Sequence, residues 1–90
     1  MRKLGPTISI LIEAFEEAGG EYEMVQLMRE YLDQREFEVC LDYIVDRVGE
    51  LNISISKEFY ELVCWCAPLV GMKTSTYEHI ESQVKEMRSE

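Results

Sequence analysis

The sequence predicts an all-α fold, a compact four- to five-helix bundle that forms a single helical domain over residues 1–90. Apolar residues recur at intervals of three and four along most of the chain, which is the period of an amphipathic helix. Hydrophobic residues make up 47% of the sequence, enough for a core and too many for a disordered acidic tail. No internal repeat or low-complexity linker divides the chain. A length of 90 residues therefore predicts one modest core.

The first two helices are predicted over residues 7–18 and 21–32. The apolar positions of the first are Ile8, Leu11, Ile12 and Phe15. Gly19 and Gly20 then end it, because consecutive glycines interrupt a helix. The apolar positions of the second are Tyr22, Val25, Met28, Tyr31 and Leu32. Both sets have helical spacing and predict one buried face per helix.

The third helix is predicted to begin at Asp33, which forms a capping-box pattern with Glu36. Its apolar stripe consists of Phe37, Cys40, Leu41, Ile44, Val48 and Leu51. On the opposite face four acidic residues recur at intervals of four, a set we call the acidic ridge: Glu38, Asp42, Asp46 and Glu50. Side chains at this interval share one face of a helix. Burial of the apolar stripe must therefore present the ridge to solvent.

Residues 52–55 alternate polar and apolar side chains and predict a short extended connector. Ser56 is the expected N-cap of a fourth helix, which is apolar on so many sides that we expect it at the centre of the bundle. Pro68 is predicted to kink or end this helix, because proline removes a backbone hydrogen bond. Gly71 stands just beyond, where a C′ glycine is common.

The last helix is predicted over residues 76–88. Ser75 and Glu78 provide a second capping-box pattern at its start. Its apolar stripe is narrow and suits the edge of a bundle: Tyr77, Ile80, Val84 and Met87.

The charge balance limits the class of partner. Eighteen acidic residues against nine basic ones give a net charge of −9. Electrostatic repulsion argues against nucleic acid and against an anionic membrane, and favours a basic protein partner or solubility alone. No run approaches the roughly 18 apolar residues of a membrane span, and the start of the chain lacks a secretory apolar region. We therefore expect a cytoplasmic protein.

The sequence offers no pattern typical of catalysis or of metal binding. His79 is the only histidine, and no nucleophile can be assigned to it. Cys64 and Cys66 are separated by one residue instead of two, and we expect them, with Cys40, to be reduced core thiols. The ridge carboxylates point away from the core. A metal site in a helical bundle would lie inside the core, so the ridge does not suit one. We expect no enzyme activity, no cofactor and no metal.

The acidic ridge leaves two interpretations open. Like charges four residues apart repel each other by a few tenths of a kcal/mol, and Asp42 and Asp46 have no basic residue three or four positions away. The ridge is either a solvated face of an acidic protein or a docking surface for a positively charged partner. Tyr43 and Val39 flank it and are predicted to be partly exposed anchors. Tyr60 and Tyr22 are further candidates. The predicted partner-binding residues are thus Glu38, Asp42, Asp46, Glu50, Tyr43 and Val39.

Residues 36–62 resemble the MafI-type immunity proteins and similar acidic helical proteins of contact-dependent growth inhibition systems. The residues that carry the resemblance are E-x-x-x-x-L-D-x-I-x-D from Glu36 to Asp46, an I-x-I-S step that ends at Ser56, and the run Phe59-Tyr60-Glu61-Leu62 in the next helix. Such proteins are encoded in bacteria beside polymorphic toxins. The resemblance implies that this chain binds a cognate basic toxin domain and blocks it. Separately, we expect a monomer or weak dimer.

Many toxins of this kind are nucleases, whose active sites are basic because they hold phosphates. The resemblance implies that the acidic ridge fills such a site or covers an adjacent one. The alternative is a small helical adaptor or regulatory subunit that binds a partner protein through a hydrophobic surface, for which the side of Met24 and Met28 is the candidate. Salt-sensitive binding would favour the first function, and salt-insensitive association the second.

Overall fold

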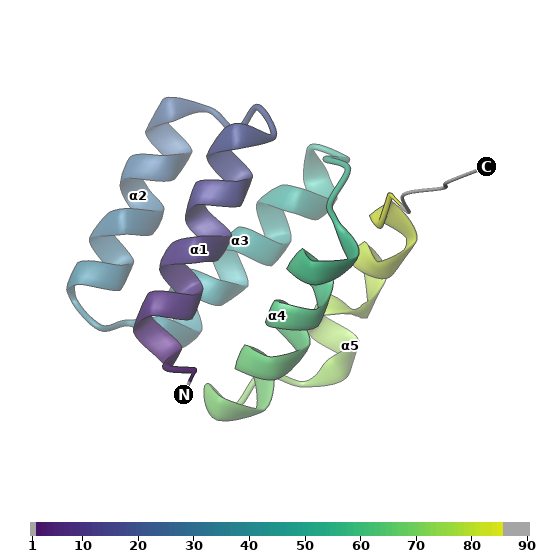
Figure 1. Ribbon diagram of the computed structural model, residues 1–90. Helices are drawn as coiled ribbons and strands as arrows, with labels where there is room; N and C mark the ends of the chain where they lie inside the picture. The colour runs from purple at the N-terminus through teal and green to yellow at the C-terminus, as the bar shows by residue number, and fades with distance from the viewer. Residues whose placement is uncertain (1, 86–90) are drawn as a thin grey trace.

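The computed structural model describes residues 2–85, and the chain within these limits is helical. Its elements are α1 (Leu4–Glu17), α2 (Tyr22–Asp33), α3 (Phe37–Glu50), α4 (Lys57–Leu69), α5 (Thr74–Tyr77) and the 3-10 helix η1 (Glu78–Gln83) (Figure 1). The only pairing of extended backbone in the described part is an isolated parallel bridge between Ile55 and Val84. The predicted all-α bundle is confirmed.

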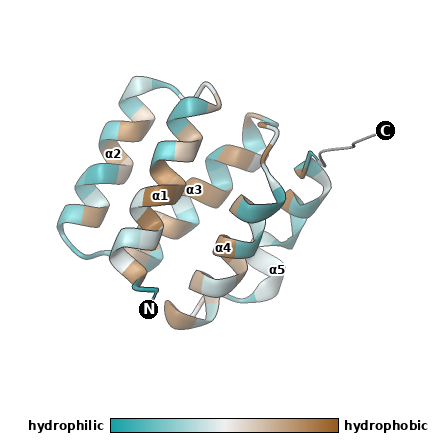
Figure 2. Cartoon of the chain, viewed as in Figure 1, coloured by the Kyte–Doolittle hydropathy of each residue, from teal (hydrophilic) through white to brown (hydrophobic). Residues whose placement is uncertain are grey.

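Helices α1 and α3 lie at the centre of the bundle. α1 packs against α2, α3 and α4, while α3 contacts every other element (Figure 1). α4 lies to one side, so the prediction that it would be central is wrong. Hydrophobic residues gather on α1 and on the surfaces that face it (Figure 2). The largest side chains of the core, all at most 1% exposed, are Ile8, Leu11, Ile12, Phe15, Met28, Leu41, Ile44, Val45, Val48, Val63 and Ile80.

The predicted apolar stripes form the core with two exceptions. Tyr22, the first residue of α2, is 71% exposed. Leu51 is 39% exposed, since it caps α3 and lies outside its last turn. α1 begins at Leu4, three residues earlier than predicted. Pro6 fits there, because backbone N–H groups in the first turn of a helix need no intrahelical partner.

The predicted capping box at Asp33 is wrong, because Asp33 is the last residue of α2. Beyond it, Arg35 has φ of 59° and its N–H donates to the carbonyl of Leu32 at 2.9 Å. The N–H of Glu36 donates to the carbonyl of Tyr31, also at 2.9 Å. This pair of bonds is the Schellman motif. The same motif ends α1, α3 and α4 at Gly19, Asn52 and Gly71.

Replacing Arg35 with glycine should stabilise the protein. An L-residue in the left-handed region is strained, and glycine relieves that strain while adding some entropy to the unfolded chain. We expect the free energy of unfolding of Arg35→Gly to rise by about 0.5–1 kcal/mol in urea titrations. Arg35→Ala removes the same charge and keeps the strained Cβ, so it should show no such gain. Equal stability of the two variants would contradict the prediction.

The start and the end of α4 follow the sequence prediction. The hydroxyl of Ser56 accepts a hydrogen bond from the N–H of Phe59 at 2.9 Å and caps the helix. Pro68 lies in the last turn, and the helix ends one residue later at Leu69. Gly71 then takes φ of 81°, and the N–H of Met72 donates to the carbonyl of Ala67 at 2.8 Å. Pro68 therefore accompanies the end of α4 instead of kinking its middle.

The predicted helix over residues 76–88 is wrong within the described residues, and its end with Met87 lies outside them. α5 has only four residues, Ser75 lies inside it, and Lys73 is its N-cap. The side-chain amide of Gln83, the last residue of η1, donates to the carbonyls of Val48 and Ile53, at 2.9 and 2.8 Å. The N–H of Ile55 donates to the carbonyl of Gln83 at 3.0 Å. These bonds fix the chain against the extended connector, so the α-helix does not continue.

Candidate protein-binding surface

All four residues of the acidic ridge are exposed, but they do not form one straight row. Four residues of an α-helix advance about 400° around its axis, so each ridge residue lies about 40° beyond the previous one. From Glu38 to Glu50 the ridge turns by about 120°. Its first half, Glu38 and Asp42, borders a hollow that Thr76 of α5 also lines. Its second half, Asp46 and Glu50, lies beside Arg47.

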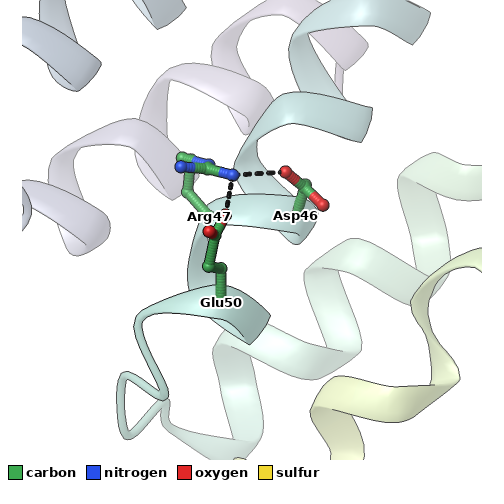
Figure 3. Close-up of polar contacts among 3 residues, drawn as sticks. All are labelled: Asp46, Arg47 and Glu50. Carbon is green, nitrogen blue, oxygen red and sulfur yellow. Dashed lines mark hydrogen bonds and ion pairs between the residues drawn. The ribbon is translucent and has the colours of Figure 1, made fainter.

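The second half of the ridge is paired with Arg47 (Figure 3). One guanidinium nitrogen, Nη2, lies 2.7 Å from Oδ2 of Asp46 and also contacts Oε1 of Glu50. The hydrogen bond to Asp46 is the main reason why the pKa of Arg47 is raised. Asp46 has no basic residue three or four positions away, and its partner is its direct neighbour Arg47. A single cation thus offsets part of the charge of both carboxylates.

Tyr43 is half-buried, and its ring is engaged within the protein. It packs edge-on against Tyr31, with ring centroids 6.0 Å apart and an interplanar angle of 69°. The guanidinium carbon of Arg47 lies 5.6 Å from the centroid of the Tyr43 ring. Tyr60 is similarly half-buried, 6.1 Å from Tyr77. Of the three tyrosines considered as anchors, Tyr22 alone is largely exposed.

The first half of the ridge borders an apolar groove. Two adjoining hollows, of about 400 and 390 Å³, share Glu38 and Val39 as lining residues. We call the two hollows together the Val39 groove, which runs between α3 and the end of α4. Its other lining residues are Leu4, Arg35, Glu36, Phe37, Asp42, Leu69, Val70, Gly71, Met72, Lys73 and Thr76. Val39 is 46% exposed and Leu69 is 57% exposed. Among residues 2–85, neither Glu38 nor Asp42 forms an ion pair.

The hydrophobic surface expected at Met24 and Met28 is absent. Met28 is fully buried in the core and Met24 is half-buried. The exposed large hydrophobic residues of the described part are Ile10, Tyr22, Val39, Leu51 and Leu69. Val39 and Leu69 come together in one hollow although 30 positions separate them in the sequence. These two exposed apolar side chains therefore lie beside the first half of the ridge.

The remaining candidate residues have structural surroundings. Cys40 and Cys66 are buried and Cys64 is half-buried, and all three are free thiols. His79 lies exposed on η1, with its ring against Gly49 of α3. No group of three or more potential metal ligands occurs among the described residues. None of the helices between residues 2 and 85 combines the length and apolar character needed to span a bilayer.

The buried thiols make the fold sensitive to alkali. Burial raises the pKa of Cys40 and of Cys66 from 9.0 to about 11. Between pH 9 and 11 the folded state therefore keeps thiol protons that the unfolded state releases. The free energy of unfolding keeps its full value below pH 9 and falls as the pH rises toward 11. We expect each thiol to lower the free energy of unfolding by about 1.4 kcal/mol at pH 10. Urea titrations at pH 8, 9 and 10 measure the effect, and Cys66→Ala should roughly halve its slope. An unchanged slope would contradict it.

In comparisons with family models, with curated proteins and with solved structures, no match to this chain was found. A function therefore has to come from its own residues and surface. Glu38, Asp42 and Val39 on α3 are candidate residues predicted from sequence, whereas the opposite wall of the groove was not predicted. Leu69 and Met72 belong to the end of α4 and the following loop, and only tertiary packing places them beside Val39.

Proposed function

We propose that this chain is an immunity protein, which binds a cognate basic toxin domain inside the producing cell and blocks it. The observation that carries the proposal is the exposed acidic ridge on α3, whose first half borders the apolar Val39 groove. Complementary charge accelerates association, to about 10⁸–10⁹ M⁻¹s⁻¹ at low salt. Charge is screened beyond about 8 Å at physiological ionic strength, so affinity requires apolar contacts as well. The carboxylates of the ridge supply the complementary charge, and exposed Val39 and Leu69 beside its first half supply the apolar contacts.

A nuclease is the toxin class that best suits this surface. A nuclease must bind phosphates and therefore carries a basic active site. Carboxylates repeated along α3 can occupy that site in place of the substrate phosphates, or they can bind basic residues next to it. Both modes use the same ridge and place it against the toxin. The resemblance of residues 36–62 to immunity proteins supports the same class.

Calorimetry with the adjacent toxin tests the proposal. The C-terminal domain of the protein encoded next to this gene is titrated with the full chain at 50 mM and 300 mM salt. One-to-one binding that is nanomolar at the lower salt and markedly weaker at the higher salt is the expected result. Absence of binding to that domain, with both proteins folded by circular dichroism, would refute the immunity function.

The second candidate function is an adaptor or regulatory subunit, which Val39 and Leu69 favour because both are exposed in one groove. An adaptor of this kind would bind its partner mainly by apolar contact. Its affinity would then change little between the two salt concentrations. Sedimentation of the free chain adds a second criterion, since a stable homodimer would indicate that the groove serves self-association.

A further inference from the structure

We infer that the Val39 groove binds an amphipathic helix of the partner, with apolar side chains in its two hollows and lysine or arginine side chains along Glu38 and Asp42. This inference rests on the proposed function, since it specifies what the toxin domain presents to the chain. It differs from a purely electrostatic contact in assigning most of the affinity to apolar anchors.

The apolar part of the groove is incomplete without a partner. Val39 and Leu69 line one hollow and remain about half exposed, whereas Met72, which lines the adjoining hollow with Val39, is only 8% exposed. The hydrophobic character of α4 continues into its last turn (Figure 2). A side chain inserted into the groove would remove Val39 and Leu69 from water, and desolvated apolar contacts of this kind dominate affinity in protein interfaces.

The charge at the groove determines where the partner's cations lie. Glu38 and Asp42 follow each other at one helical turn, about 6 Å apart along α3. A second helix alongside α3 presents its own residues i and i+4 at the same spacing, so two cations can meet the two carboxylates. Lys73 lines the hollow on the other wall and disfavours a cation there. The basic residues of the partner therefore belong on the α3 side only.

The walls of the groove favour a helix over an extended peptide. An extended peptide obtains affinity by pairing its backbone with a strand edge. Here the walls are α3 and the end of α4, where the Schellman bonds of Gly71 and Met72 already use the carbonyls of Pro68 and Ala67. No strand edge lines the groove among the described residues. A helix satisfies its own backbone and requires only side-chain contacts.

A synthetic peptide tests the inference separately from the toxin. The probe is a helical peptide with leucines at i, i+3, i+4 and i+7 and lysines on one flank, and the control has the same composition in scrambled order. Both are titrated into the labelled full chain and followed by amide NMR shifts. We expect the helical peptide to shift Val39, Leu69, Val70 and Met72, and to bind at least about tenfold more tightly than the scrambled one.

Matched variants show whether the groove is responsible. Val39→Gln combined with Leu69→Gln should lower the affinity for the helical peptide about tenfold or more, while Ile10→Gln, at an apolar residue 50% exposed outside the groove, should not. Equal binding of the scrambled peptide, shifts confined to the paired half of the ridge, or no binding would overturn the inference. None of these results would refute the immunity function, which fails only if the toxin domain itself does not bind.

Discussion

Reversal of Glu38 and Asp42 to lysine should weaken binding to the proposed basic toxin domain by at least about 100-fold at low salt. Both carboxylates are exposed, border the Val39 groove and form no ion pair among the described residues. Two lysines in their place would face the partner's cations, and like charges across an interface cost several kcal/mol. Surface plasmon resonance at 50 mM salt measures the affinity and both rate constants, and the loss should include a slower association.

The matched control is the reversal of Asp46 and Glu50 to lysine. Each pair of reversals raises the net charge by four units, from −9 to −5. The control, however, acts on carboxylates whose charge Arg47 already offsets in part. We expect a loss of only about tenfold from this second pair. Equal losses would mean that overall charge governs binding. No loss from either pair would identify the acidic ridge as merely solvated surface.

Both pairs of reversals should leave the fold intact, so that a loss of binding can be interpreted. Glu38 lies in the first turn of α3, where a negative charge is favourable to the helix by up to about 1 kcal/mol. Reversal at Asp42 removes a repulsion with Asp46 and compensates in part. Thermal unfolding should therefore differ little between the two double variants. Loss of folding in either one would remove it from the comparison and leave the single substitutions Asp42→Lys and Asp46→Lys as the test.

The sequence was sufficient to predict the helices and their buried faces because these depend on local spacing. Ile8, Leu11 and Ile12 are fully buried as their period requires. Helix ends were predicted where glycine marked them, at Gly19 and Gly71. The end of α2 was predicted to within one residue, but the turn before α3, in which Arg35 adopts the same left-handed conformation, was not. An arginine in the left-handed conformation cannot be recognised from its residue type, because only glycine, and at times asparagine, is typical of that conformation.

The candidate surface could be predicted only in part, for reasons of geometry and of tertiary contact. The four-residue interval predicted an exposed ridge, but the small difference between 4 and 3.6 residues per turn separates Glu38 from Glu50 around the helix. The pairing within the second half depends on the rotamer of Arg47. The groove depends on the approach of Leu69 to Val39, and the loss of the last predicted helix depends on the bonds of Gln83 to α3 and the connector. The contacts of Leu69 and Gln83 join residues far apart in the sequence, and the rotamer of Arg47 is not determined by residue spacing.

The second large effect is expected at Gly20, where alanine should lower the free energy of unfolding by about 3 kcal/mol. A Cβ at this position would lie 2.2 Å from Cε2 of Phe15 and 2.8 Å from the carbonyl oxygen of Phe15. The ring of Phe15 is 1% exposed and cannot move without disturbing the core, and the N–H of Gly20 donates to that same carbonyl. Urea titration of Gly20→Ala measures the loss.

Neighbouring Gly19 separates steric conflict from backbone strain. Gly19 has φ of 103°, but its Cβ would meet nothing within 4 Å. Gly19→Ala should therefore cost only the conformational strain, about 1–2 kcal/mol. In a Phe15→Leu background the smaller side chain leaves room beside residue 20, so the additional cost of Gly20→Ala should fall by about 1 kcal/mol or more while that of Gly19→Ala stays the same. If the cost of Gly20→Ala is unchanged in that background, contact with the Phe15 ring is not its cause, and the backbone turn between α1 and α2 alone requires the glycine.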